Sequence, residues 1–249
     1  MPDLEGALRA LAGVPKLVVA LDFDGVLAPI VAVPSDARPL PEARAAIESL
    51  VAHPGTTVAL LSGRGLADLA AVSGLGRPVR LIGSHGSELD DGGDVLDEVQ
   101  RARLDELTAE LQELVDGEPG VVLEHKPAGV AVHVRHAEPE VAERVLDAVR
   151  AGPAARDGVE ATPGKAVLDL AVLQMNKGAA LDALREQVRA DAVLFAGDDV
   201  TDETAFARLR DGDVGVKVGD GETAARFRVA DPAAMADVLR RLVELRGLG

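Results

Sequence analysis

The sequence predicts an α/β protein with a Rossmann-like, doubly wound parallel-sheet core and an inserted, smaller α+β cap domain. Two observations predict the core: short continuous apolar runs recur along the chain, and helical patterns follow most of them. Such runs are typical of parallel strands that are buried on both faces of a sheet. A third observation predicts the insertion, because a middle segment replaces this alternation with paired strand-like runs.

The core strands are predicted at the apolar runs 16–21, 57–61, 79–82, 193–196 and 214–218. A helix over 42–51 follows the first strand, because Pro39 and Pro41 are typical of a helix entrance. A second helix is predicted over 179–187. The chain ends in a helix whose apolar residues recur at three- and four-residue spacing, namely Val238, Leu239, Leu242 and Leu245.

The middle of the chain has a different order of elements. A long amphipathic helix is predicted by Leu104, Leu107, Leu111 and Leu114. Strands at 121–124 and 130–135, a helix over 138–150, and strands at 159–161 and 166–170 follow it. Helix, paired strands, helix and paired strands indicate a small α+β unit. We therefore expect a cap over 90–174, inserted into a core formed by 1–89 and 175–249.

Composition narrows the classes of function. The formal net charge is −16, from 26 Lys and Arg against 42 Asp and Glu, which argues against nucleic acid and anionic membrane surfaces as partners. The absence of Cys excludes disulfides and thiolate metal sites. The N-terminus is acidic where a signal peptide is basic, and the apolar runs are far shorter than the ~18 residues of a membrane span. We expect a cytoplasmic monomer that acts on a small molecule.

Two clusters of carboxylates follow predicted strands. Asp22 and Asp24 come directly after the first strand, and Asp198, Asp199 and Asp202 follow the strand at 193–196. Ligands bind at such strand ends in open α/β sheets, and carboxylate oxygens are the ligands that Mg²⁺ prefers. An Asx turn is an alternative for the first cluster. A helix N-terminus is an alternative for Asp202, but it does not explain Asp198 or Asp199.

Two further segments have groups that suit a phosphate. Ser62, Gly63 and Arg64 follow the strand at 57–61, and Lys177 precedes the helix at 179–187. Backbone N–H groups at such positions bind anions, and a lysine supplies a cation. Each segment has an alternative, with Ser62 as a helix cap and Lys177 as a solvated surface charge.

Taken in chain order, Asp22 with Asp24, Ser62, Lys177 and the 197–202 segment resemble the four motifs of haloacid dehalogenase-like phosphohydrolases. Finer matches resemble the trehalose-6-phosphate phosphatase family and lie at 61–64, 83–88, 124–129, 133–135, 176–178 and 197–203. The resemblance covers nearly the whole chain. It implies Mg²⁺-dependent hydrolysis of trehalose 6-phosphate in trehalose synthesis.

The resemblance also implies a role for each core residue. Asp22 would attack phosphorus to form an aspartyl-phosphate, and Asp24 would act as the general acid and base. One Mg²⁺ would bind Asp22, Asp198 and the backbone carbonyl of Asp24. Asp199 and Asp202 would orient those ligands. Lys177 and Ser62 would neutralise the phosphoryl oxygens.

Substrate-binding positions follow from the same resemblance, which assigns Ser62, Gly63, Arg64, His85, Glu88, Glu124, Lys126, His133 and Arg135. One departure concerns residues 169–172, where the family has a Glu-Ile-Arg-Pro-like segment and this chain has Asp-Leu-Ala-Val. It leaves open a phosphatase for another sugar or glycoside phosphate. A non-catalytic sugar-phosphate sensor is a second alternative, but it does not explain why every catalytic residue of the motifs is present.

Overall fold

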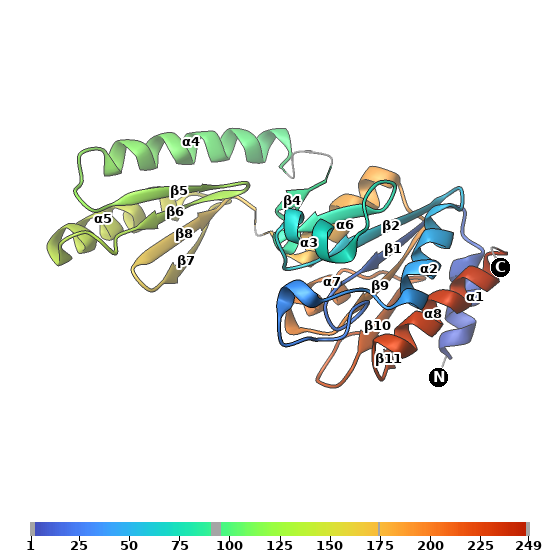
Figure 1. The fold of residues 1–249 in the computed structure, drawn as a ribbon. Coiled ribbons are helices and arrows are strands. Elements are labelled where there is room, and N and C mark those ends of the chain that lie inside the picture. The colour runs from blue at the N-terminus through green and yellow to red at the C-terminus, as the bar shows by residue number, and fades with distance from the viewer. Residues whose placement is uncertain (1–2, 91–95, 174, 248–249) are drawn as a thin grey trace. The chain divides into compact units, whose positions relative to one another are not determined.

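The protein is described by a computed structural model that covers residues 3–90, 96–173 and 175–247 (Figure 1). It divides into two compact units, one formed by Met1–Gly93 with Asn176–Gly249 and the other by Asp94–Met175. The predicted junction at 174 and the adjoining segment 91–95 lie outside the described residues. A parallel sheet with helices in the first unit and an antiparallel sheet in the second confirm the predicted fold class.

The first unit contains a seven-stranded sheet in the order β11-β10-β9-β1-β2-β3-β4. The bounds are β1 Leu17–Leu21, β2 Thr56–Leu61, β3 Arg80–Gly83, β4 Glu88–Leu89, β9 Ala192–Gly197, β10 Val214–Val218 and β11 Phe227–Val229. All neighbours pair in parallel except β3 and β4. From β1 the chain adds β2, β3 and β4 on one side, and it later adds β9, β10 and β11 on the other side. The strand order therefore reverses between β1 and β9, and ligands bind at such a point in open α/β sheets.

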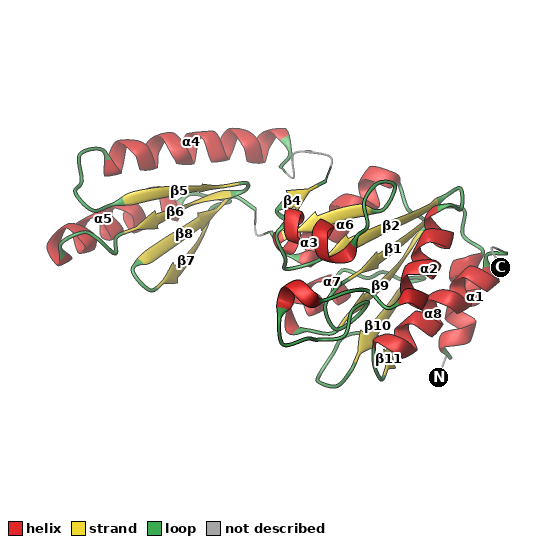
Figure 2. Cartoon of the chain, in the orientation of Figure 1, coloured by secondary structure: helices red, strands yellow, loops and turns green. Residues whose placement is uncertain are grey.

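Helices cover both faces of this sheet (Figure 2). One face packs in a common core with α1 Leu4–Ala12, α2 Pro41–Val51, α3 Leu66–Ser73 and α8 Pro232–Leu245. The other packs with α6 Lys177–Val188 and α7 Glu203–Phe206. Every residue of β1 is buried, because alternate side chains of the strand enter the two cores. This double burial explains why the strand appears in the sequence as an unbroken apolar run.

The second unit is a four-stranded antiparallel sheet in the order β5-β6-β8-β7 with two helices. The bounds are α4 Glu98–Val115, β5 Val122–Lys126, β6 Gly129–His133, α5 Pro139–Ala151, β7 Glu160–Gly164 and β8 Val167–Ala171. Leu168 and Leu170 of β8 join the helices in a separate core. Side chains alternate between the faces of a strand, so Asp169 between these leucines lies on the opposite, open face.

The structure also corrects several local expectations. Ser62 does not cap a helix, because α3 begins only at Leu66, with Gly65 as its N-cap residue. Its amide instead continues the sheet by donating to the Ile82 carbonyl. The elements α1, β4 and β11 had no prediction, and β4 and β11 are only two and three residues long, too short for periodicity to indicate them. The helix start considered as an alternative for Asp202 is present, because α7 begins at Glu203 with Asp202 as its N-cap residue. No helix in the described part of the chain is long and apolar enough to cross a membrane.

Candidate active site

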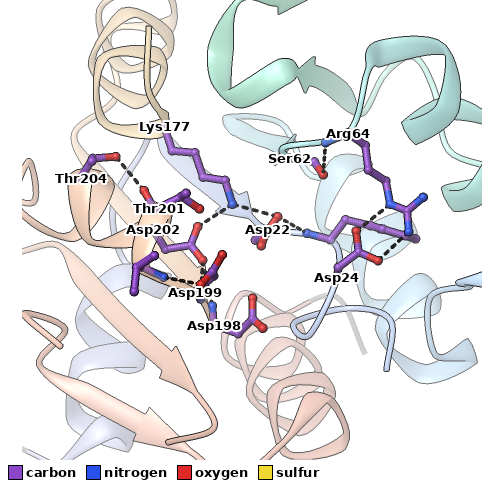
Figure 3. A network of polar contacts seen from close by, with 12 residues as sticks. Asp22, Asp24, Ser62, Arg64, Lys177, Asp198, Asp199, Thr201, Asp202 and Thr204 are labelled. Carbon is purple, nitrogen blue, oxygen red and sulfur yellow. Dashed lines mark hydrogen bonds and ion pairs between the residues drawn. The ribbon is translucent and has the colours of Figure 1, made fainter. Parts of the chain in front are cut away.

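The predicted core residues meet at the carboxyl end of the parallel strands, beside a cavity of about 640 Å³. Asp22 follows β1, Ser62 follows β2, Asp198 follows β9, and Lys177 is the first residue of α6. All four line this cavity. Figure 3 shows the Lys177 side chain reaching between Asp22 and Asp202. Residues from distant parts of the sequence therefore converge because parallel strands end at one edge of the sheet.

Lys177 holds two buried carboxylates. Its ammonium nitrogen lies 3.0 Å from Asp22 Oδ1 and 2.7 Å from Asp202 Oδ1. Burial lowers the pKa of Lys177, but the charges of Asp22 and Asp202 outweigh burial and hold the pKa above its ordinary value. The lysine therefore stays charged, and with 2% of its side chain exposed it is not the solvated surface charge considered as an alternative.

Asp202 is fully buried and uses both of its carboxylate oxygens within the protein. Oδ1 accepts from Lys177, and Oδ2 accepts the backbone N–H groups of Asp198 and Asp199, each at 2.9 Å. A Cβ at Gly197 would overlap the Asp202 side chain, so glycine permits this close approach. Asp202 thus holds the loop that carries Asp198.

The arrangement fits a hard divalent cation. Asp22, Asp198 and Asp202 each offer an oxygen within 4.8 Å of the others. Burial raises the pKa of both Asp22 and Asp198, and the negative charge of Asp202 raises them further. Such carboxylates are unfavourable without a counter-charge, and an oxygen-rich set suits Mg²⁺. Because Lys177 and two backbone amides already occupy the carboxylate oxygens of Asp202, Asp22 and Asp198 are the better-placed ligands for the cation.

Asp24 is held by Arg64. The guanidinium donates to both Asp24 oxygens, at 2.6 and 2.8 Å, and also to Asp68 at 2.7 Å and to the Pro34 carbonyl at 2.9 Å. It also lies 5.7 Å from the centre of the Phe23 ring. Arg64, predicted as a substrate ligand, is therefore engaged inside the first unit, and its carboxylate partner is the predicted general acid and base.

A strained turn brings His85 to the cavity. Ser84 and His85 have φ values of 48° and 56°, a region that non-glycine residues rarely adopt. The Glu88 carboxylate holds the turn by accepting from the Ser84 hydroxyl and, at 2.8 Å, from the Leu66 amide. His85 lines the cavity over Gly63, where a Cβ would lie 2.6 Å from His85 Cε1. His85 thus faces the site, whereas both oxygens of Glu88 already have partners.

The remaining predicted substrate residues lie in the second unit. Glu124 of β5 and His133 of β6 are 2.7 Å apart, and Lys126 of β5 contacts both oxygens of Asp169 at 2.7 Å. The strand register places these four on the open face of the sheet. Arg135 is exposed in the turn after β6. No site role was predicted for Asp169, although the alternation of Leu168, Asp169 and Leu170 in the sequence indicates that it lies on the other face of the strand from the two leucines.

Comparison with known proteins places this geometry in a family. A profile described as trehalose-phosphatase matches residues 20–233. The trehalose-phosphate phosphatases of Mycobacterium marinum and Mycobacterium ulcerans are each 38% identical to the chain, over 100% of it and 68% of each relative. The Aspergillus fumigatus trehalose-6-phosphate phosphatase structure (crystal form 3) is 26% identical, with a TM-score of 0.67, over 100% of this chain and 98% of that one. The chain belongs to the trehalose-phosphatase family.

Proposed function

We propose that the chain hydrolyses trehalose 6-phosphate to trehalose and phosphate, as a step of trehalose biosynthesis. The observation that carries this proposal is the convergence of Asp22, Ser62, Lys177 and Asp198 at one cavity in a member of the trehalose-phosphatase family. The family membership supports the reaction class, a phosphoric monoester hydrolysis. The cytoplasmic location and the monomeric state stay predictions.

The chemistry would proceed in two displacements at phosphorus. The Asp22 carboxylate attacks the phosphoryl group, and the bond from phosphorus to the sugar oxygen breaks. Asp24 donates a proton to that leaving oxygen. In the second displacement Asp24 takes a proton from water, whose oxygen attacks phosphorus and releases inorganic phosphate from Asp22. After the second displacement Asp22 is again a free carboxylate and Asp24 is again protonated, so both are ready for the next turnover.

The phosphoryl oxygens need positive partners during both steps. Lys177 supplies an ammonium group beside Asp22, and the Ser62 hydroxyl lies at the same cavity. These groups are fixed before the substrate arrives, so they stabilise charge in the transition state without reorganising. Asp22, Asp198 and the backbone carbonyl of Asp24 would hold Mg²⁺. When bound, the ion would neutralise the charge of the reacting phosphoryl group.

Asp24 cannot transfer a proton while Arg64 occupies both of its oxygens. At least one of these contacts must be exchanged for the leaving oxygen of the sugar. We infer that Arg64 orients Asp24 and is a partner of the general acid, in addition to any contact that it makes with the phosphate. The same guanidinium is anchored by Asp68 and Pro34, so it remains in place when one contact to Asp24 opens.

We infer that the second unit provides specificity for the disaccharide. Its open sheet face carries Glu124, Lys126, His133 and Asp169 as two polar pairs. Carboxylates accept hydrogen bonds from sugar hydroxyls and an ammonium group donates to them, so this face suits a neutral sugar. Only 2% of the chain is aromatic, with neither Trp nor Tyr, so recognition must rely on hydrogen bonds.

A panel of phosphate esters tests the proposal. Phosphate release is measured with trehalose 6-phosphate, sucrose 6-phosphate, glucose 6-phosphate and a mannosyl phosphate, each with Mg²⁺. We expect kcat/KM to be highest for trehalose 6-phosphate by at least about tenfold, because a site built to form hydrogen bonds with particular hydroxyls discriminates strongly against substrates that misplace them. Equal values across the panel would refute the specificity and leave the phosphatase chemistry standing.

A second candidate function rests on residues 169–172. Asp169 is shorter than the Glu of the family segment, and here it pairs with Lys126. This difference favours a different sugar or glycoside phosphate as the alternative substrate. A preference for another ester in the same panel would support it. No turnover of any ester would instead favour a sugar-phosphate sensor.

A further inference from the structure

Lys217 is a buried lysine behind the carboxylate cluster. It belongs to β10, where Val216 and Val218 on either side are also buried, and only 3% of Lys217 is exposed. The strand register pairs it with Gly197 of β9, the residue directly before Asp198. Its ammonium group donates a hydrogen bond to the backbone carbonyl of Asp198. The lysine therefore contacts the loop of the proposed metal site from the protein interior.

A charge in this place requires an explanation. Removing an ammonium group from water is unfavourable unless a partner compensates it. Lys177 has two carboxylate partners, whereas in the described part of the chain no carboxylate forms an ion pair with Lys217. An apolar residue would satisfy the packing of a buried strand without this desolvation penalty. The position of Lys217 is therefore better explained by what it does to Asp198 than by stability.

Asp198 is fixed at both ends of its backbone. Its N–H group donates to Asp202 Oδ2 at 2.9 Å, and its carbonyl accepts from Lys217. Both partners are buried and neither side chain lines the cavity. Together they set the direction in which the Asp198 side chain leaves the strand end, and that side chain packs closely against Gly25.

We propose that Lys217 is a positioning residue that aims the Asp198 carboxylate at the divalent cation. This inference rests on the proposed function, because it assigns that cation to Asp22 and Asp198. Lys217 itself would not touch the cation, the substrate or the reacting atoms. Its contribution would pass through one hydrogen bond to the backbone of a ligand residue.

The sign of the effect on metal affinity separates this role from a simple charge effect. If Lys217 acted only as a nearby positive charge, its removal would strengthen the binding of a cation. If Lys217 positions Asp198, its removal weakens binding, because the carboxylate loses its direction. Loss of a partner that orients a metal ligand lowers metal affinity by about 10- to 100-fold. The two explanations thus predict opposite changes.

The experiment is a calorimetric titration of Mg²⁺ into the metal-free full chain, without substrate. Lys217→Met removes both donor and charge, and Lys217→Gln keeps a donor without the charge. Lys16→Met is the matched control, because it removes the same charge from an exposed position at the opposite end of β1. We expect Kd for Mg²⁺ to rise about 10-fold or more in Lys217→Met, to rise less in Lys217→Gln, and to stay unchanged in Lys16→Met.

A thermodynamic cycle and a kinetic measurement complete the test. In an Asp198→Asn background, Lys217→Met should change Kd no further, because the carboxylate that Lys217 positions has been removed. At saturating Mg²⁺, Lys217→Met should regain most of its kcat with an unchanged KM for trehalose 6-phosphate. An unchanged or tighter Kd in Lys217→Met would overturn the proposal, and so would a full additional effect in the Asp198→Asn background.

The outcomes keep this inference separate from the proposed function. Binding is measured without substrate, so a chain that binds Mg²⁺ but does not hydrolyse trehalose 6-phosphate would refute the function and still test Lys217. If Lys217→Met does not fold, as judged by circular dichroism, Lys217→Leu repeats the removal of donor and charge with another apolar side chain, and an unchanged or tighter Kd in that variant overturns the proposal. A parent chain that binds no Mg²⁺ overturns the inference outright.

Discussion

The Arg64 guanidinium binds the Asp24 carboxylate through two hydrogen bonds of 2.6 and 2.8 Å. The pair links Arg64, which follows β2, to the first carboxylate cluster, which follows β1. Only 11% of the Arg64 side chain is exposed. A planar guanidinium fits a carboxylate at two points, so the pair fixes both the position and the rotation of Asp24. The proposed general acid is therefore oriented by a neighbouring side chain before any substrate binds.

Replacing Arg64 by Lys tests this orientation. Lysine keeps the charge but cannot form the two-point contact. We expect kcat to fall about 10-fold or more, because general acid catalysis contributes about 10²- to 10⁴-fold, and KM to change little. Steady-state kinetics measure both, with Arg44→Lys as the control on the exposed pair with Glu48. A rise in KM at constant kcat would instead indicate that Arg64 mainly binds the substrate.

Gly25 is required for the approach of the two carboxylate loops. Its φ is +73°, and an added Cβ would overlap the Asp198 carboxylate. We expect Gly25→Ala to destabilise the fold by about 1–2 kcal/mol through the left-handed backbone and to raise the Mg²⁺ concentration needed for activity. Denaturant unfolding and Mg²⁺ titration measure the two effects. Gly76→Ala is the control, since a Cβ there meets no atom within 4 Å; equal behaviour of the two variants would refute this role.

Much of the fold and of the core site could be predicted because the relevant residues are contiguous in sequence. A buried parallel strand is an apolar run, and Asp22 and Asp198 directly follow such runs. The partners of these residues could not be predicted in the same way. The pair of Asp24 and Arg64 depends on how two loops meet, and the contact of Lys126 with Asp169 depends on the register of three antiparallel strands. Lys217 lies within an apolar run, whose pattern does not show where a long side chain ends.

Glu88 gives a prediction for the dependence of stability on pH. The Ser84 hydroxyl and then the Leu66 amide hold the pKa of Glu88 below its ordinary value. A carboxyl with a lowered folded-state pKa contributes stability above its unfolded pKa, about 4.3, and that contribution disappears as the pH falls through the folded-state pKa. We expect Glu88→Gln to lower the free energy of unfolding by about 1 kcal/mol at pH 7.

The difference between the parent and Glu88→Gln should then close in acid. Denaturant unfolding at a series of pH values measures it. Glu222→Gln serves as the control, because Glu222 is exposed. A difference between the parent and Glu88→Gln that stays constant down to low pH would mean that the Gln side chain destabilises the turn because it does not fit there. The charge of Glu88 would then have no role in holding the turn.

The most direct test of the central claim is to identify the residue that carries the phosphoryl group during turnover. The enzyme is mixed with Mg²⁺ and phosphate-labelled trehalose 6-phosphate, quenched in acid within a turnover, and mapped by peptide mass spectrometry. We predict label on Asp22, none in Asp22→Asn, and a loss of about 10³-fold or more in kcat for that variant, with Asp36→Asn behaving as the parent. Label on another residue, or full turnover by Asp22→Asn, would contradict the account.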